Sequence, residues 1–202
     1  MSNIPLRRLV ASAWLLGLAG CAAGLRQAEP AQYDLGPAEG GNADIPALRA
    51  VDVRAAPWLD STAMQYRLAY ADPARRQAYA ASRWAAPPPA LLEQWLRQRF
   101  LTTAAPPGRC RLQVELDEFV QVFASDRASR SEIELRAALL PPRGETPLAR
   151  HAFAVGEDAA SADARGGVAA HRAAAKALAD KLGAWLGRTA ADLPAVAAQC
   201  GN

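Results

Sequence analysis

Residues 111–123 read Arg-Leu-Gln-Val-Glu-Leu-Asp-Glu-Phe-Val-Gln-Val-Phe, and apolar side chains alternate with polar ones along most of this stretch. A period of two is typical of a β-strand with one buried face. The same alternation returns in residues 132–139 and in residues 149–155. Breaks of hairpin length separate the three segments, so we expect three strands in an antiparallel meander.

The residues before this meander predict further strands. Residues 50–55, 64–70 and 76–84 have strand-like alternation, and the pair Asp72-Pro73 marks a turn between the last two. A shorter strand signal covers residues 33–37.

Two other segments have the apolar spacing of helices. The first follows three consecutive prolines and covers residues 91–100. The second covers residues 168–185, with Ser161 as its expected N-cap and Asp163 in the favourable first turn. We attribute the Gly166-Gly167 pair near its start to close backbone packing, which offsets the poor helix propensity of glycine.

Runs of strands interrupted by two helices favour the α+β class. We therefore expect a single domain over residues 33–202. Its sheet should be mainly antiparallel, with two principal helices packed on one face.

The N-terminus has the order of charges and apolar residues that marks an exported protein. Arg7 and Arg8 precede an uncharged apolar run, residues 9–18, which is too short to span a bilayer. The following Leu-Ala-Gly-Cys21 resembles a bacterial lipobox. We expect residues 1–20 to be a signal peptide and Cys21 to be acylated, with palmitate among its chains. An ordinary secretory signal that contains a cysteine is the alternative.

Residues 21–32 are then an acylated cysteine and a flexible tether, since residues 22–32 show no apolar period. In bacterial lipoproteins an Asp after the acylated cysteine favours retention at the inner membrane. Here that position is Ala22, so we expect the protein to be anchored at the periplasmic face of the outer membrane.

The net charge of the chain is only +3 and its arginines are scattered along the sequence, so we expect no nucleic-acid partner.

Acylation of Cys21 leaves two cysteines in an oxidising compartment. We favour a disulfide between Cys110 and Cys200, which would close a loop of about 90 residues and hold the C-terminal segment. Two unpaired thiols are the alternative.

We find no catalytic constellation in the sequence. The two histidines are His151, expected on the surface of a strand, and His171, expected as a packed residue on the last helix. Neither lies in a hydrolase or zinc motif, and Asp117 and Glu118 should point to opposite faces of their strand. We therefore expect no enzyme activity, no metal and no cofactor.

Aromatic and arginine residues gather between positions 58 and 95, which is typical of a contact surface. We take Trp58, Arg67, Arg83 and Trp84 as candidate interface residues. A place in the hydrophobic core is the alternative for the two tryptophans.

Several segments together resemble the ABC-type transport auxiliary lipoproteins, a family similar to the paraquat-inducible lipoprotein that accompanies MCE (mammalian cell entry) proteins. The matching motifs are Tyr33-Asp-Leu-Gly-Pro37, Val51-Asp-Val53, Ala56-Pro-Trp-Leu-Asp60, Met64-Gln-Tyr-Arg67, Ser82-Arg-Trp84, Leu116-Asp-Glu-Phe119 and Gly166-Gly-Val168.

The resemblance implies a non-enzymatic component of a system that moves phospholipids or other hydrophobic molecules between membranes. An MCE-domain protein is the implied partner, and another copy of this chain is a second candidate. A periplasmic carrier with an acyl-chain pocket between sheet and helices is the main alternative. A cell-envelope hydrolase with an unrecognised site is the third.

Overall fold

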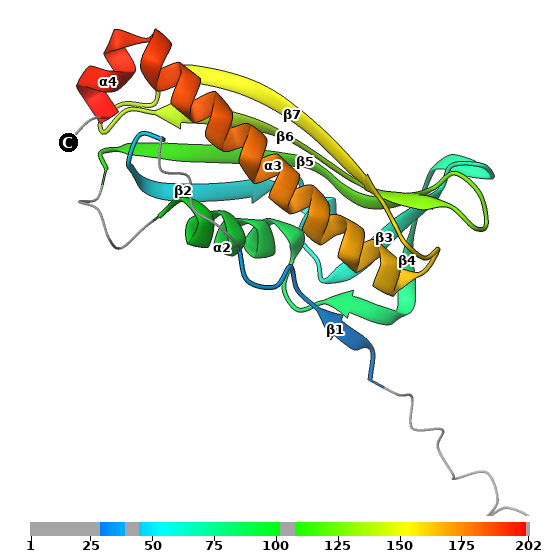
Figure 1. The fold of residues 1–202 in the computed structure, drawn as a ribbon. Helices are drawn as coiled ribbons and strands as arrows, with labels where there is room; N and C mark the ends of the chain where they lie inside the picture. The colour runs from blue at the N-terminus through cyan, green and yellow to red at the C-terminus, as the bar shows by residue number, and fades with distance from the viewer. Residues whose placement is uncertain (1–28, 39–44, 102–107, 201–202) are drawn as a thin grey trace, which may run out of the picture.

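The computed structural model describes residues 29–38, 45–101 and 108–200, which form one sheet with helices against one of its faces (Figure 1). The sheet has seven strands. In chain order the elements are β1 (Ala31–Tyr33), β2 (Leu48–Ala55), the 3-10 helix η2 (Pro57–Leu59), β3 (Ala63–Leu68), β4 (Asp72–Trp84), α2 (Pro88–Phe100), β5 (Cys110–Phe123), β6 (Ser129–Leu140), β7 (Ala149–Asp158), α3 (Ala164–Asp192) and α4 (Pro194–Cys200).

The antiparallel meander predicted from the alternating residues is confirmed as β5, β6 and β7. Leu116 lies opposite Leu135, which in turn lies opposite Phe153, so one row of apolar side chains crosses all three strands. These strands are long and strongly twisted (Figure 1).

The sheet as a whole is mixed, so the expectation of a mainly antiparallel sheet was wrong. Both β2 and β3 run parallel to β5 along the same edge, β2 beside its first half and β3 beside its last three residues. The short β1 also runs parallel to its neighbour, β4. Parallel pairing needs a long connection, and the β3–β4 hairpin with α2 supplies one between β2 and β5.

Two long helices pack against the same face of the sheet, as expected, and α4 is a third helix that the sequence did not predict. The helix α3 lies across β6 and β7, whereas α2 lies along β2 (Figure 1). The carboxylate of Glu93 in α2 accepts a hydrogen bond at 2.9 Å from the backbone N–H of Val53, an amide of β2. Fully buried side chains fill the space between the layers; among the largest are Leu92, Leu96, Leu112, Leu116, Phe119, Leu178, Leu182 and Leu186.

The N-cap of α3 is Asp163 and not Ser161. The Asp163 carboxylate accepts a hydrogen bond from the backbone N–H of Gly166 at 2.7 Å, and this bond lowers the pKa of the Asp163 carboxyl. Ser161 instead donates its hydroxyl proton to the same carboxylate. The close packing inferred for the glycine pair is confirmed, since a Cβ on Gly167 would collide with the side-chain oxygen of Gln121.

Cys110 and Cys200 are joined by a disulfide, with their Cα atoms 4.9 Å apart. The bond attaches α4 to the first residue of β5. Residues 1–20, Cys21 and Ala22 lie outside the described residues. Of the expected tether, Ala31 and Gln32 belong to β1 and pair with β4, so the domain begins before residue 33. Within the described ranges, no helix combines the length and the apolar character needed to cross a membrane.

Candidate docking site

A β-bulge in β5 decides which side chains lie on the outer face, meaning the face of the sheet away from α2 and α3. Leu116 pairs with Leu135 but Glu118 pairs with Glu134, so Asp117 is an extra residue in β5. Beyond the bulge the alternation is shifted by one position. Asp117 and Glu118 therefore both lie on the outer face, and the expectation that they point to opposite faces was wrong.

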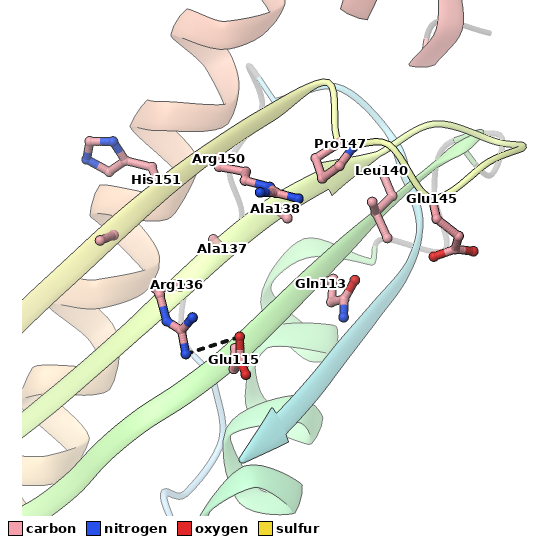
Figure 2. A pocket seen from close by; sticks show the side chains of 11 residues that line it. Gln113, Glu115, Arg136, Ala137, Ala138, Leu140, Glu145, Pro147, Arg150 and His151 are labelled. Carbon is pink, nitrogen blue, oxygen red and sulfur yellow. Dashed lines mark ion pairs between the residues drawn. The ribbon is translucent and has the colours of Figure 1, made fainter. Parts of the chain in front are cut away.

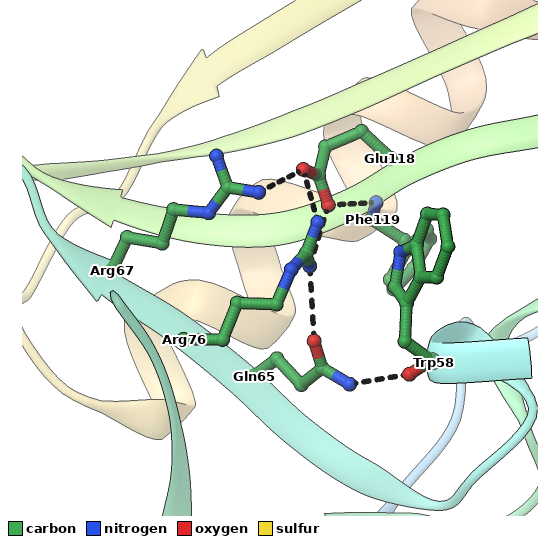
Figure 3. Close-up of polar contacts among 6 residues, drawn as sticks. All are labelled: Trp58, Gln65, Arg67, Arg76, Glu118 and Phe119. Atoms are coloured by element: carbon green, nitrogen blue, oxygen red, sulfur yellow. Dashed lines mark hydrogen bonds and ion pairs between the residues drawn. The ribbon is translucent and has the colours of Figure 1, made fainter. Parts of the chain in front are cut away.

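Glu118 is the centre of a polar cluster formed with β3 and β4. One guanidinium nitrogen of Arg67 lies 2.6 Å from its carboxylate, and Arg76 donates two hydrogen bonds of 2.9 and 2.7 Å to the two oxygens. Arg76 also donates to the side-chain oxygen of Gln65 at 3.0 Å. Figure 3 shows the three side chains meeting at the carboxylate. We call Gln65, Arg67, Arg76 and Glu118 the arginine cluster.

The arginine cluster carries a net positive charge and is partly shielded from water. The Glu118 side chain is 12% exposed, and those of Arg67 and Arg76 are 28% and 26% exposed. A bidentate arginine–carboxylate pair is rigid, so it holds the guanidinium groups in fixed positions. The Nε of Arg67 is buried without a hydrogen-bond partner. That atom is out of a partner's reach, but the exposed parts of the two guanidinium groups, oriented by Glu118, suit a carboxylate or phosphate on a binding partner.

Trp58 adjoins the arginine cluster through Gln65. The carbonyl oxygen of Trp58, in η2, accepts a hydrogen bond from the Gln65 amide at 2.7 Å (Figure 3). The Trp58 side chain is 54% exposed. An exposed indole beside oriented guanidinium groups combines two residue types that contribute much of the binding energy at protein interfaces. The structure thus brings two of the candidate interface residues, Trp58 and Arg67, close together. We call Trp58 and the arginine cluster the docking site, as the candidate contact surface.

The other two candidates do not join this site. Trp84 is only 2% exposed and packs edge-to-face on Phe119 and His171, so it belongs to the core and we remove it from the candidate interface. The physical reason is that its strand turns this side chain toward α3. Arg83 is half-buried and lies next to Trp84 in β4, opposite Ala63 and not Gln65.

Sequence reasoning missed Gln65, Arg76 and Glu118 as members of the site. The adjacent Asp117 and Glu118 interrupt an otherwise regular alternation, and two successive polar residues inside such a strand are a signal of a bulge. No comparable signal marks Arg76, because its partner lies 42 residues away in the chain.

The histidines occupy the environments that the sequence predicts. The Nδ1 atom of buried His171 lies 2.8 Å from the carbonyl oxygen of Gly167, and burial lowers the pKa of the imidazole to about 4. His151 is exposed and projects from β7 toward α3 (Figure 2). In the described part of the chain, no three His, Cys, Asp or Glu side chains gather as metal ligands would.

An open groove of about 540 Å³ lies at the other end of the outer face (Figure 2). Arg136 lines one end of it, with ion pairs of 3.1 Å to Glu115 and 2.7 Å to Asp117. Gln113, Glu145 and Arg150 also line it. Ala137, Leu140 and Pro147 line it as well, so polar and apolar groups mix in an open surface groove, unlike the enclosed and mainly apolar pocket that an acyl chain requires.

Comparison with known proteins identifies relatives of this chain. Residues 31–183 match the family described as the ABC-type transport auxiliary lipoprotein component. No curated protein matches the sequence.

Two crystal structures have a similar fold. One is of a Xanthomonas campestris protein of the DUF330 family, 21% identical, with a TM-score of 0.66 over 80% of this chain and 97% of that one. The other protein is described only as uncharacterized; it is 12% identical, with a TM-score of 0.59 over 78% and 98% of the two chains.

Proposed function

Because this chain belongs to the family of ABC-type transport auxiliary lipoprotein components, we propose that it is the docking subunit of an MCE-type transport system. The family is associated with transport and is not a known enzyme family. In our proposal the system moves phospholipids or other hydrophobic molecules between membranes. Acylated Cys21 anchors the subunit in the outer membrane, and the residues between Cys21 and β1 let the domain reach its partner.

The observation that carries this proposal is the exposed Trp58 held beside the arginine cluster. The contact of a large indole with water is unfavourable, and a partner that covers the indole gains this free energy on binding. Next to it, half-buried guanidinium groups already lose part of their hydration in the unbound protein. Binding an acidic group there needs less reordering than binding it to flexible surface arginines. We propose that the MCE-domain partner presents an apolar pocket for Trp58 and a carboxylate for the arginine cluster.

The filled interior supports docking over the carrier alternative. An acyl chain held between sheet and helices needs an apolar cavity of several hundred Å³. Here Phe119, Leu116, Leu178 and Leu182 occupy that space and are at most 2% exposed. The groove of Figure 2 lies on the outer face, away from this interior.

The test measures binding of the full-length lipoprotein, in detergent, to the MCE-domain protein of its own transport system. We expect Trp58→Ala to raise the Kd about 30-fold, since truncating a central interface tryptophan typically costs about 2 kcal/mol. The melting temperature should change little, because the side chain is half in water already.

Tyr70→Ala is the matched control, since Tyr70 is also 54% exposed but lies past the other end of β3. The control should bind like wild type. Equal binding by wild type and Trp58→Ala would contradict the proposal. Native mass spectrometry of the detergent-extracted protein separates the alternatives, since one retained lipid per chain would favour the carrier.

A further inference from the structure

The strand β7 ends the meander and has one unused edge. Its ten residues pair with β6, and no other described strand pairs with them. In Figure 1 β7 forms the border of the sheet along its whole length, with α3 against the inner face. A long edge strand offers unpaired backbone groups to another chain, and proteins either block such an edge or use it.

The hydrogen bonding to β6 shows which residues offer those groups. The backbone N–H of Ala159 donates to the carbonyl of Ser129 at 2.9 Å, in the same register that sets Asp158 opposite Arg130. Antiparallel pairs alternate between hydrogen-bonded and non-hydrogen-bonded positions. Odd-numbered residues of β7 therefore bond to β6. The backbone groups of Arg150, Ala152, Ala154, Gly156 and Asp158 point to the free edge.

This edge is complementary to itself in one antiparallel register. When Ala154 lies opposite Ala154 of a second copy, Arg150 lies opposite Asp158 of that copy on the outer face. On the inner face, His151 lies opposite Glu157 of that copy. The two-fold axis repeats the Arg150–Asp158 pair, and the small Ala152 and Gly156 lie opposite one another between the two copies of that pair.

Neighbouring registers lose this match. In each facing pair, the backbone groups of both residues must point to the free edge, so both residues must be even-numbered. The second copy can therefore shift only by two residues at a time, which moves the centre of the pairing by one residue. A centre at Phe153 places Arg150 opposite Gly156, and a centre at Val155 places Asp158 opposite Ala152. Neither pairs opposite charges. The charge pattern thus favours a second copy of this chain as the partner of β7, and it favours the register centred on Ala154.

We propose that a second copy of this chain docks on β7, by antiparallel pairing centred on Ala154, so that one sheet runs through both copies. The interface is isologous, as in most soluble dimers. This inference is independent of the docking site, because β7 lies on the opposite side of β5 from β3 and β4.

Cysteine cross-linking of the full-length protein in detergent tests the geometry. Facing hydrogen-bonded residues have Cα atoms about 5.5 Å apart, which a disulfide can bridge. Ala154→Cys should therefore form a covalent dimer under mild oxidation, seen on a non-reducing gel. Ala152→Cys is the matched control. It is also exposed and lies on the same strand and face, but its two copies would lie about 14 Å apart, too far for a disulfide.

Charge reversal tests the register. Arg150→Asp and Asp158→Arg each place like charges opposite one another twice, so each should weaken dimerisation at least roughly tenfold in analytical ultracentrifugation. The double variant restores both pairs and should dimerise like wild type, which also shows that the variants fold. A wild type that stays monomeric, equal cross-linking at positions 152 and 154, or no rescue by the double variant would overturn the proposal.

Discussion

His171 is a neutral histidine enclosed by aromatic rings. Its ring centroid lies 4.4 Å from that of Phe119 and 5.4 Å from that of Trp84, and its Nε2 atom is buried without a hydrogen-bond partner. Protonation would place a charge in this apolar site, and for that reason the pKa of the imidazole falls to about 4.

This environment predicts a pH-dependent stability. In the unfolded chain the imidazole binds a proton below pH 6.5, whereas in the folded protein it stays neutral down to about pH 4. The unfolded state therefore holds more protons in this window. We expect the free energy of unfolding to fall by roughly 3 kcal/mol as the pH drops from 6.5 to 4, and the loss to level off below that.

Urea denaturation of wild type and His171→Phe between pH 7 and pH 4 measures this effect. The variant keeps an aromatic ring in the site but has no group that titrates there, so its stability should depend much less on pH. Carboxyl groups such as Asp163, whose pKa is lowered, affect both proteins alike. Identical pH dependence in the two proteins would contradict this account of His171.

At the scale of elements, the bulge in β5 and the helix α4 are the two features that depart most from a regular strand-and-helix pattern. The bulge turns Glu118 toward the β3–β4 hairpin, and the two arginines of that hairpin then neutralise it. The helix α4 has only seven residues, too few to be stable alone, and Val196 and Cys200 are its buried contacts with the domain.

The disulfide should therefore matter for α4 and for the whole domain. It closes a loop between positions 90 residues apart, for which the chain-entropy estimate is about 4–5 kcal/mol of stability. We expect the double variant Cys110→Ala and Cys200→Ala to unfold at a much lower urea concentration than wild type.

Alkylation tests the bond directly. When the protein is denatured without reductant and alkylated, Cys110 and Cys200 should remain unmodified. When it is reduced before alkylation, mass spectrometry should show one added alkyl group on each of them. Full labelling of Cys110 and Cys200 before reduction would rule out the pairing.

At the scale of the whole molecule, the layers separate two kinds of surface. The inner face of the sheet is buried under α2 and α3, whereas the outer face carries the docking site and the groove around Arg136. The strands that carry both sites belong to one continuous sheet. The first described strand, β1, lies at the end of the sheet where β4 and β3 also lie (Figure 1).

The proposed location at the outer membrane depends on two neighbouring residues, Cys21 and Ala22, which can be tested separately. We expect Cys21→Ala to remove the acyl anchor, so that the protein stays as an uncleaved precursor or is released into the periplasm. We expect Ala22→Asp, the matched control, to remain acylated but to be retained at the inner membrane. Sucrose-gradient separation of the two membranes measures both outcomes. Mature Cys21→Ala protein in the outer-membrane fraction after a high-salt wash would contradict the anchor.

The strands and helices follow from local patterns in the sequence. Alternation in residues 111–123 and 132–139 identifies β5 and β6 and their buried faces, because side chains in a strand alternate wherever it lies. The proline run and the apolar residues spaced three to four positions apart identify α2, because one face of a helix repeats with that spacing. These features depend on residues a few positions apart, which the sequence displays directly.

The direction of neighbouring strands and the members of the docking site were decided by tertiary structure. Alternation is the same in parallel and antiparallel strands, so it contains no information about which way β2 and β3 run beside β5. Similarly, Trp58 and Trp84 look alike as candidates in the sequence, yet one is half exposed and the other is buried under α3. Arg67 meets Glu118 across 51 residues. Such contacts depend on how the whole chain packs, and no local pattern records them.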